Sequence, residues 1–362
     1  MDFALTDDQD QMLRAVARWI DRSWARADPG SPADRRAAWN ELAANGWTGL
    51  LTPRSSPVLD ATLVVEALAH GRCSLPVGPG GMIAPLVAAA AGLTPGDLAD
   101  PGSGDQLLCA TEGRDPTAAA AATVARGLEL ADRVVVLAAT TPAGSTPAGW
   151  SLAGRRWWAA AVAVDPADPG AGETGAGPAI EVAQDEGRTV LCRLAAPVAA
   201  EAWQPLDPAQ GELSWLAGAV LSAAELVGLA RAVLDSCVAY AGQRVQGGRP
   251  IGGHQAIQHR LADMLGAVER ARYLTYAAAV DLADAAAGFR PGRTVATVHR
   301  AKALAARDCV AAIRSGHQVM GAIAYSAEHE LHHLHKQAVV AASEHGDAAR
   351  HWAALEAATA TR

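Results

Sequence analysis

A loop rich in glycine and proline, QRVQGGRPIGGHQ, contains Arg244. The loop follows a long apolar stretch with few helix breakers, so we expect Arg244 at the end of a helix. A guanidinium in that position can bind a pyrophosphate through two parallel hydrogen bonds, and loop amides can add donors. A surface arginine without a ligand is the alternative. The glycines form no dinucleotide-binding fingerprint, because they follow a helix instead of a strand and their spacing differs.

A second polar group lies near the C-terminus, in the sequence HQVMGAIAYSAEHELHHL. Gln318 precedes Gly321 there, and small residues at a helix end let a cofactor approach the backbone closely. We interpret Gln318 and Gly321 as candidate cofactor contacts. A polar helix end beside tight packing is the alternative.

The histidines of this segment raise the question of a metal site. His329, His332 and His333 share one helical face at a spacing that is able to bind zinc. A helix with histidines beside Glu328 and Glu330 is more often a solvated or interface face, so we predict no metal. The cysteines form no C-x-x-C pair, which predicts buried free thiols in a reducing compartment; they are Cys73, Cys109, Cys192, Cys237 and Cys309.

Three regions must position these residues, and we predict them as domains of residues 1–105, 106–200 and 201–362. In the first, Thr6 and Gln9 form a capping-box pattern, and Ser31-Pro32 marks another helix start. The second holds short β-type runs between connectors rich in proline, glycine and alanine. The third returns to long helical periodicity, which predicts a bundle. The expected strands are Leu107–Ala110, Val134–Ala138, Trp157–Val164 and Val190–Leu194, and the expected helices include Leu59–His70, Met82–Ala91, Leu216–Tyr240, Gln255–Ala287 and Arg293–Met320.

Composition limits the classes of function. The formal net charge of −8 over 362 residues argues against a nucleic-acid-binding surface. The N-terminal sequence MDFALTDDQDQ is acidic and polar, which excludes a secretory signal peptide, and no uninterrupted apolar run reaches about 18 residues. We therefore expect a cytoplasmic protein whose partners include neither nucleic acid nor a membrane.

The segment from Gln243 to Met264, QRVQGGRPIGGHQAIQHRLADM, resembles the flavin-proximal motif R-x-Q-F-G-x-P-I-x-x-F-Q-x-I-Q-H-x-L-A-D-M of the acyl-CoA dehydrogenase family. The C-terminal segment resembles the family's Q-x-x-G-G-x-G-[FY]-[ST]-x-E-x-x-L block, and WNELAANGWTGLLTP resembles its N-terminal helical domain. Four departures stand out: Gly247 and His254 occupy positions where the family usually has Phe, and Ala322 and Ala324 replace glycines.

The resemblance implies a mainly α fold with a small β domain. The family has an N-terminal helical domain, a middle β-barrel or sandwich, and a C-terminal four-helix bundle that also forms oligomer contacts. It also implies FAD, shared across a subunit interface, because the matching arginine reaches the pyrophosphate of the neighbouring subunit's FAD. The implied cofactor-binding residues are Arg244, Gln246, Gln255, Gln318, Gly321 and Ala322.

Dehydrogenation of an acyl-CoA thioester removes the α-proton, and a carboxylate in a dry pocket serves as the general base. In the family this glutamate comes from one of two places, which correspond here to Gly218 and His345. Neither is a carboxylate. Glu344 lies one residue from the second position and is our candidate catalytic base. His345 is chemically able to act as a base, since imidazole titrates near neutrality.

The predicted β region departs from the family in a similar way. The family's T-E-P-x-x-G-S-D loop, which contacts flavin and acyl-CoA, is replaced by Thr111-Glu112-Gly113-Arg114-Asp115-Pro116. The elements that reach a neighbour's flavin are thus retained, whereas those of the chain's own flavin and substrate site look lost.

Some bacterial members of the family are α2β2 heterotetramers in which one chain carries the base and the other completes the FAD site, and several act on steroid side-chain CoA thioesters. We predict that this chain is the non-catalytic subunit of such an oxidoreductase, in lipid metabolism or steroid catabolism. Its partners would be a second subunit carrying the Glu base, an acyl-CoA substrate and, by analogy, an electron-transfer flavoprotein. The alternatives are a self-sufficient homotetrameric dehydrogenase with a relocated base, and a flavin-free scaffold or acyl-CoA-binding relic.

Overall fold

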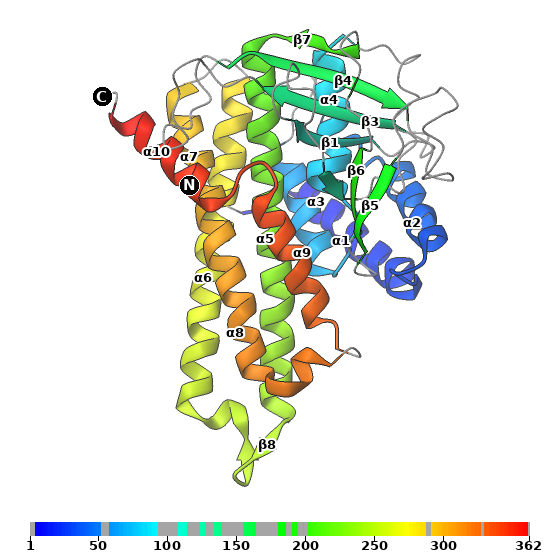
Figure 1. Cartoon of the computed structure of the whole chain (residues 1–362). Coiled ribbons are helices and arrows are strands. Elements are labelled where there is room, and N and C mark those ends of the chain that lie inside the picture. The colour runs from blue at the N-terminus through cyan, green and yellow to red at the C-terminus, as the bar shows by residue number, and fades with distance from the viewer. Residues whose placement is uncertain are drawn as a thin grey trace.

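The computed structural model describes residues 4–51, 58–92, 108–113, 124–126, 133–139, 155–163, 180–185, 190–194, 198, 202–286, 291–326 and 329–360. Long helices form a bundle, and two small sheets and the N-terminal helices pack against one end and one side of it (Figure 1).

Capping interactions set where the N-terminal helices begin and end. In the predicted capping box, Thr6 Oγ1 accepts from Gln9 N at 3.2 Å while Thr6 N donates to Gln9 Oε1 at 3.1 Å. Ser31 caps the second helix by accepting from Asp34 N. That helix ends at Ala44, and Gly46 follows the C-cap residue Asn45 with a φ of +78°, which suits glycine. The elements are α1 Asp7–Arg22, η1 Trp24–Arg26, α2 Pro32–Ala44, α3 Val58–His70, the π-helical turn η2 Val77–Met82 and α4 Ile83–Ala90.

Two sheets follow. The first has strand order β1-β3-β4-β7, with β1 parallel to β3 and the other pairs antiparallel, and the second has the order β2-β6-β5. The β-type runs of the sequence predicted four of these strands, namely β1, β3, β4 and β6. They did not predict β5 or the short strands β2 and β7. The bounds are β1 Leu108–Gly113, β2 Val124–Arg126, β3 Arg133–Ala139, β4 Trp157–Ala163, β5 Ile180–Asp185, β6 Val190–Leu194 and β7 Gln204–Leu206. The connectors 141–149 and 165–178 lie outside the described residues.

The bundle is built around α5, Pro208–Gln243. Asp207 caps this helix by accepting from Ala209 N and Gln210 N, and Pro208 at the first position needs no backbone donor. The predicted helix 293–320 is interrupted by a π-helical turn. The remaining elements are β8 Val245–Gln246, β9 Arg249–Pro250, η5 Ile251–Gly253, α6 Gln255–Ala286, α7 Pro291–Leu304, η6 Ala305–Cys309, α8 Val310–Met320, η7 Gly321–Tyr325, α9 Leu331–Ser343 and α10 Ala348–Ala360.

Among the described residues, α5 is long and apolar enough to cross a membrane by length and composition alone. The qualifying window is 94% buried within the protein, between α3, α6, α8 and α9. Its apolar surface is thus the centre of the core.

One hydrophobic core runs without a break from the N-terminal helices through β3 and β4 to the first half of α5. A second core fills the other half of the bundle. The described order of helices, strands and helices agrees with the predicted order, while the domain boundaries at residues 105 and 200 stay predictions. Cys73, Cys237 and Cys309 are buried free thiols, and burial raises the pKa of the first two to about 12.

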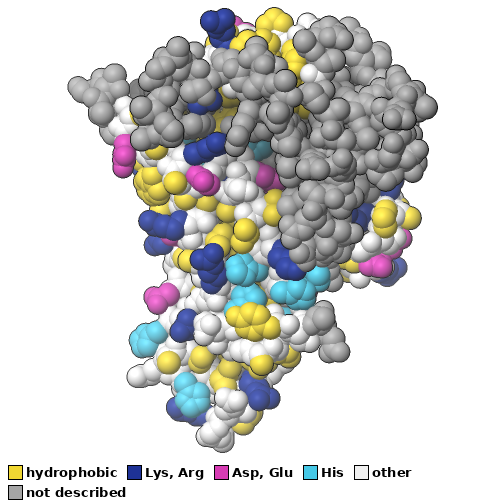
Figure 2. Space-filling view, viewed as in Figure 1, with side chains coloured by type: hydrophobic (Ala, Val, Ile, Leu, Met, Phe, Trp, Pro, Cys, Tyr) yellow, Lys and Arg dark blue, Asp and Glu magenta, His cyan; other side chains and the backbone are white. Residues whose placement is uncertain are grey.

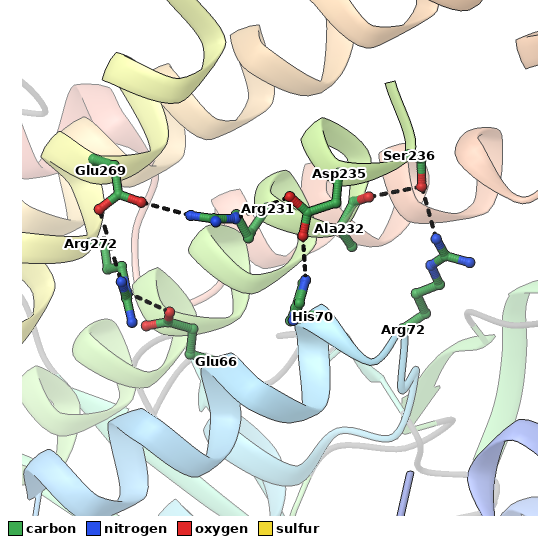
Figure 3. A network of polar contacts seen from close by, with 9 residues as sticks. All are labelled: Glu66, His70, Arg72, Arg231, Ala232, Asp235, Ser236, Glu269 and Arg272. Atoms are coloured by element: carbon green, nitrogen blue, oxygen red, sulfur yellow. Dashed lines mark hydrogen bonds and ion pairs between the residues drawn. The ribbon is translucent and has the colours of Figure 1, made fainter. Parts of the chain in front are cut away.

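Ion pairs also join α3 to the bundle (Figure 3). Arg272 Nε on α6 donates to Glu66 Oε1 on α3 at 2.8 Å. Arg231 on α5 contacts Glu269 at 2.8 Å and Asp235 at 3.2 Å. Burial raises the pKa of Glu66, and Arg272 opposes that effect. The N-terminal helices are therefore held to the bundle by both apolar packing and paired charges.

Candidate functional site

Residues from the C-terminal end of α5, the β8–β9 hairpin and the end of α8 line a pocket of about 570 Å³. The hairpin lies at the end of the bundle opposite the sheets (Figure 1). Five of the six residues predicted to contact a cofactor line the pocket: Arg244, Gln246, Gln318, Gly321 and Ala322. The sixth, Gln255, is the exposed first residue of α6 and is not among the described lining residues, although its neighbour His254 is.

The hairpin explains how Arg244 and Gln246 come to face the pocket. Gly247 and Gly248 have φ of +62° and +79°, as in the two-residue turns that match the twist of antiparallel strands. Val245 pairs with Pro250 on either side of this turn. A side chain at 247 or 248 would strain the backbone, so the glycine in place of the family's aromatic residue at 247 has a local structural role.

Gly321 ends α8 with a φ of +65°, and its N–H donates to the carbonyl of His317. Apart from its two chain neighbours, no atom of the described residues lies within 4 Å of the position that a Cβ would take there. The backbone is therefore open on the pocket side, as the sequence predicted for a close approach by a ligand.

Sequence reasoning missed the apolar part of the pocket. Tyr240 lies one turn before Arg244 on the same face of α5, and Met320 and Ile323 flank Gly321. His254 also lines the pocket, and its Nδ1 lies 3.1 Å from Arg249 Nη2. In the sequence, His254 stands out only because the family usually has Phe at this position. That departure does not by itself indicate that His254 lines a pocket.

Histidine side chains gather on the neighbouring face of the bundle (Figure 2). His335 Nδ1 lies 3.1 Å from His317 Nε2, and burial lowers the pKa of both rings, which favours their neutral forms. The rings of His332 and His333 lie 4.0 Å apart. Among the described residues no three His, Cys, Asp or Glu side chains are arranged to hold a metal ion, and Glu328 lies outside them.

The two residues at the family's base positions face one another. A Cβ at Gly218 on α5 would lie 2.2 Å from Nε2 of His345, which stands in the turn between α9 and α10. His345 is 7% exposed, and its Nδ1 lies 3.4 Å from Ser222 Oγ. Glu344, the candidate base, is the half-buried residue that caps the end of α9. The side chain against Gly218 is thus that of His345.

Two further histidines lie behind this turn. His351 Nε2 is 2.9 Å from the carbonyl oxygen of His345, and His351 Nδ1 is 2.8 Å from His299 Nδ1. Because a carbonyl only accepts, Nε2 of His351 donates, which leaves its Nδ1 to accept from His299 Nδ1–H. Burial lowers the pKa of His299 to about 4 and that of His351 well below its usual range, so both rings are neutral near pH 7.

Trp215 and Lys302 complete this buried group. The Trp215 ring stacks on His351 with centroids 5.2 Å apart. Lys302 has no exposed surface, and its Nζ donates to the carbonyls of Ala341 at 2.6 Å and Ala342 at 3.3 Å, at the end of α9. Sequence reasoning did not single out any of these residues, because each belongs to an ordinary helical pattern.

The pocket and the Gly218–His345 contact are far apart. Gly218 and Arg244 are separated by about two thirds of one continuous helix, α5. At about 1.5 Å per residue this amounts to roughly 39 Å. A dinucleotide in the pocket cannot bridge that span within one chain.

The sequence model of the family described as acyl-CoA dehydrogenase, C-terminal domain, matches residues 215–359. This region is therefore similar to the C-terminal domain of the acyl-CoA dehydrogenases. Acyl-CoA dehydrogenase IpdE2 of Mycobacterium tuberculosis is 40% identical over 139 residues, which cover 38% of this chain and 39% of that protein. The matched part is therefore well under half of the relative's length.

Solved structures extend the likeness to the whole chain. Butyryl-CoA dehydrogenase from Megasphaera elsdenii superposes with a TM-score of 0.68 at 20% identity, covering 99% of this chain and 100% of that one. The Tcur3481-Tcur3483 steroid ACAD, as its G363A variant, gives 0.72 at 17% identity, covering 98% of each chain. The predicted fold class, mainly α with a small β part, is confirmed as that of the acyl-CoA dehydrogenases.

The family's flavin and acyl-CoA loop falls partly outside the described residues. Thr111, Glu112 and Gly113 end strand β1, and residues 114–116 are not described. The prediction that this loop has lost its contacts to flavin therefore stays a prediction.

Proposed function

We propose that this chain is a subunit of a FAD-dependent acyl-CoA dehydrogenase that oxidises the α,β-carbon bond of an acyl-CoA thioester. In this proposal its end-of-bundle pocket completes the FAD site of a partner subunit, which supplies the glutamate base. FAD supplies the hydride acceptor when it is bound.

The pocket suits the ADP half of FAD. Arg244 provides a cation for the pyrophosphate, and Gln246 and Gln318 provide amide donors. Gly321 leaves the backbone open to a phosphate or ribose, and Tyr240 offers an aromatic surface to the adenine. The residue set thus combines one charge, two amides and apolar walls, as cofactor sites generally do.

The observation that carries the proposal is the separation of this pocket from the chain's own base position. Roughly 39 Å of helix stands between Arg244 and the Gly218–His345 contact. A flavin whose ADP half lies at Arg244 would not reach that contact within the same chain, and in our proposal it presents its isoalloxazine ring to another chain. That geometry supports an FAD shared between subunits.

The missing carboxylate favours a heteromer over a self-sufficient homotetramer. Neither Gly218 nor His345 is acidic, and the His345 imidazole fills the space beside Gly218. The name of the similar steroid ACAD joins two proteins, Tcur3481 and Tcur3483, which supports a two-chain assembly. A steroid side-chain CoA ester as substrate is also part of this proposal. An electron-transfer flavoprotein as electron acceptor and a cytoplasmic location are also part of it.

Co-expression with a glutamate-bearing acyl-CoA dehydrogenase tests the proposal. We expect a heteromer that contains FAD, while Arg244→Gln weakens FAD binding about 30- to 150-fold, because a charge-assisted bidentate pair contributes about 2–3 kcal/mol. Flavin absorbance per mole of protein and the Kd of FAD for the apo-complex measure this. Arg14→Gln is the control, since Arg14 is 71% exposed and pairs with Asp10 on α1.

Two outcomes would contradict the proposal. Stoichiometric flavin and full dehydrogenase activity in the chain purified alone would show a self-sufficient enzyme, with Glu344 as the first residue to replace. A chain that stays colourless and inactive beside every glutamate-bearing partner would show a flavin-free scaffold or acyl-CoA-binding protein.

A further inference from the structure

The contact between Gly218 and His345 leaves no room for any side chain on α5 at that point. A Cβ at 218 would lie 2.2 Å from Nε2, 2.3 Å from Cδ2 and 2.7 Å from Cε1 of the imidazole. These distances are far inside van der Waals contact, and the atoms belong to a rigid ring. A residue larger than glycine at 218 and an imidazole in this position exclude one another.

The imidazole is held where it is by its own backbone. His345 has a φ of +52° and Gly346 a φ of +93°, so the chain turns through two left-handed residues. His351 Nε2–H donates to the carbonyl of His345, and a Cβ at Gly346 would lie only 3.0 Å from that same Nε2. The turn is therefore packed tightly against His351.

The elements on either side fix the turn further. Lys302 on α7 binds the last carbonyls of α9, and His299 on α7 donates to His351 on α10. The Trp215 ring on α5 stacks on His351. Because α5, α7, α9 and α10 all contribute, the turn that carries the imidazole cannot move without disturbing several buried contacts, and the ring itself lies against Ser222 Oγ.

We propose that His345 is a plug that seals the α5 base position of this chain. It fills the volume that a glutamate at 218 would need, so a base cannot be restored there by one substitution. This inference rests on the proposed function, which it deepens. The subunit is non-catalytic because of its packing at position 218 as well as because of the missing carboxylate.

A double-mutant cycle on the thermal unfolding of the full chain tests the plug. We expect Gly218→Ala to lower the Tm by several degrees in the natural chain. In the His345→Ala background the same substitution should leave the Tm unchanged or raise it, because the methyl group then enters a cavity and alanine favours a helix over glycine. An equal loss of Tm in both backgrounds would overturn the proposal.

Gly266→Ala is the matched control. Gly266 is an exposed glycine within α6, and apart from the backbone of α6 and its chain neighbours no atom of the described residues lies within 4 Å of its Cβ position. Its substitution should change the Tm by the same small amount in both backgrounds. If Gly218→Ala yields no folded protein, the comparison of His345→Ala with the double variant decides: an unchanged or higher Tm supports the plug, and a further loss overturns it.

Gly218→Glu extends the test to the base itself. We expect it to fold only in a His345→Gly background, and folding of the single variant with an unchanged Tm would overturn the plug. These measurements use the chain alone and need no flavin or partner. A failure of the plug is thus distinguishable from a failure of the proposed function, which is judged by FAD uptake in the heteromer.

Discussion

At the scale of single residues, the buried histidines beside the α9–α10 turn are arranged for neutral rings. His351 donates through Nε2 and accepts through Nδ1, so a second proton on its ring would remove the acceptor that His299 needs. Burial lowers the pKa of both rings in the same direction. Structure and electrostatics therefore agree on the protonation state of this group.

The same arrangement predicts a loss of stability in mild acid. The pKa of His299 is about 4 in the folded chain and near 6.5 when unfolded, so the unfolded chain binds more protons between these values. The contribution of His299 to the free energy of unfolding is fully present above pH 6.5. Up to about 3 kcal/mol of it is lost as the pH falls to 4. Urea unfolding at a series of pH values measures this.

His299→Asn is the informative variant, because an amide nitrogen can still donate to His351 while it cannot titrate. We expect a shallower dependence of the unfolding free energy on pH. An unchanged dependence would assign the acid sensitivity to other groups.

Residue types and spacing singled out residues that line the pocket, but they did not indicate the contact between Gly218 and His345. Arg244, Gln318 and Gly321 stand within dense local patterns, which can be read without knowing the fold. Gly218 and His345 are far apart in the sequence, and their contact depends on two left-handed residues at the turn. No local pattern indicates such a contact, so it emerges only once α5 and the α9–α10 turn are placed together.

At the scale of elements, helices were predicted well and short strands poorly. The periodicity of α3, α5 and α6 extends over many residues, and each helix agrees with its expected range to within a few residues except at the start of α5. The strands β7, β8 and β9 have only two or three residues, too few for an alternating pattern. The π-helical turn η6 leaves no signal in hydrophobic periodicity, so α7 and α8 were predicted as one helix.

The ion pairs between α3 and α6 give a prediction at this scale. Arg272→Met should lower the free energy of unfolding by about 3 kcal/mol, because it leaves the buried Glu66 carboxylate without its charged partner. Adding Glu66→Gln should recover part of that loss. Chemical denaturation measures both variants.

Arg14→Met is the control for this prediction, since its pair with Asp10 is exposed and should contribute no more than about 0.5 kcal/mol. If Arg272→Met and Arg14→Met have equal effects, the contact between α3 and α6 is held by apolar packing alone.

At the scale of the whole molecule, α5 contributes to both hydrophobic cores. Trp215, Leu216, Val220 and Leu221 are buried in the same core as residues of α3 and α4, while the second half of α5 packs with α8 and α9. The predicted boundary near residue 200 separates α5 from the N-terminal helices in sequence. The first hydrophobic core is nevertheless continuous across that boundary.

A bundle fragment tests what this continuity means for stability. Residues 202–362 expressed alone would expose the apolar face that α3 and α4 cover, and each large side chain transferred to water costs about 1.5–3 kcal/mol. We expect the fragment to bind a hydrophobic dye and to lose the cooperative thermal transition of the full chain. Co-expression with residues 1–105 should restore part of that transition, because it returns the covering helices. A fragment that unfolds cooperatively at the Tm of the full chain would show an independent bundle, and the N-terminal helices would then contribute to a site or an interface instead of to the core.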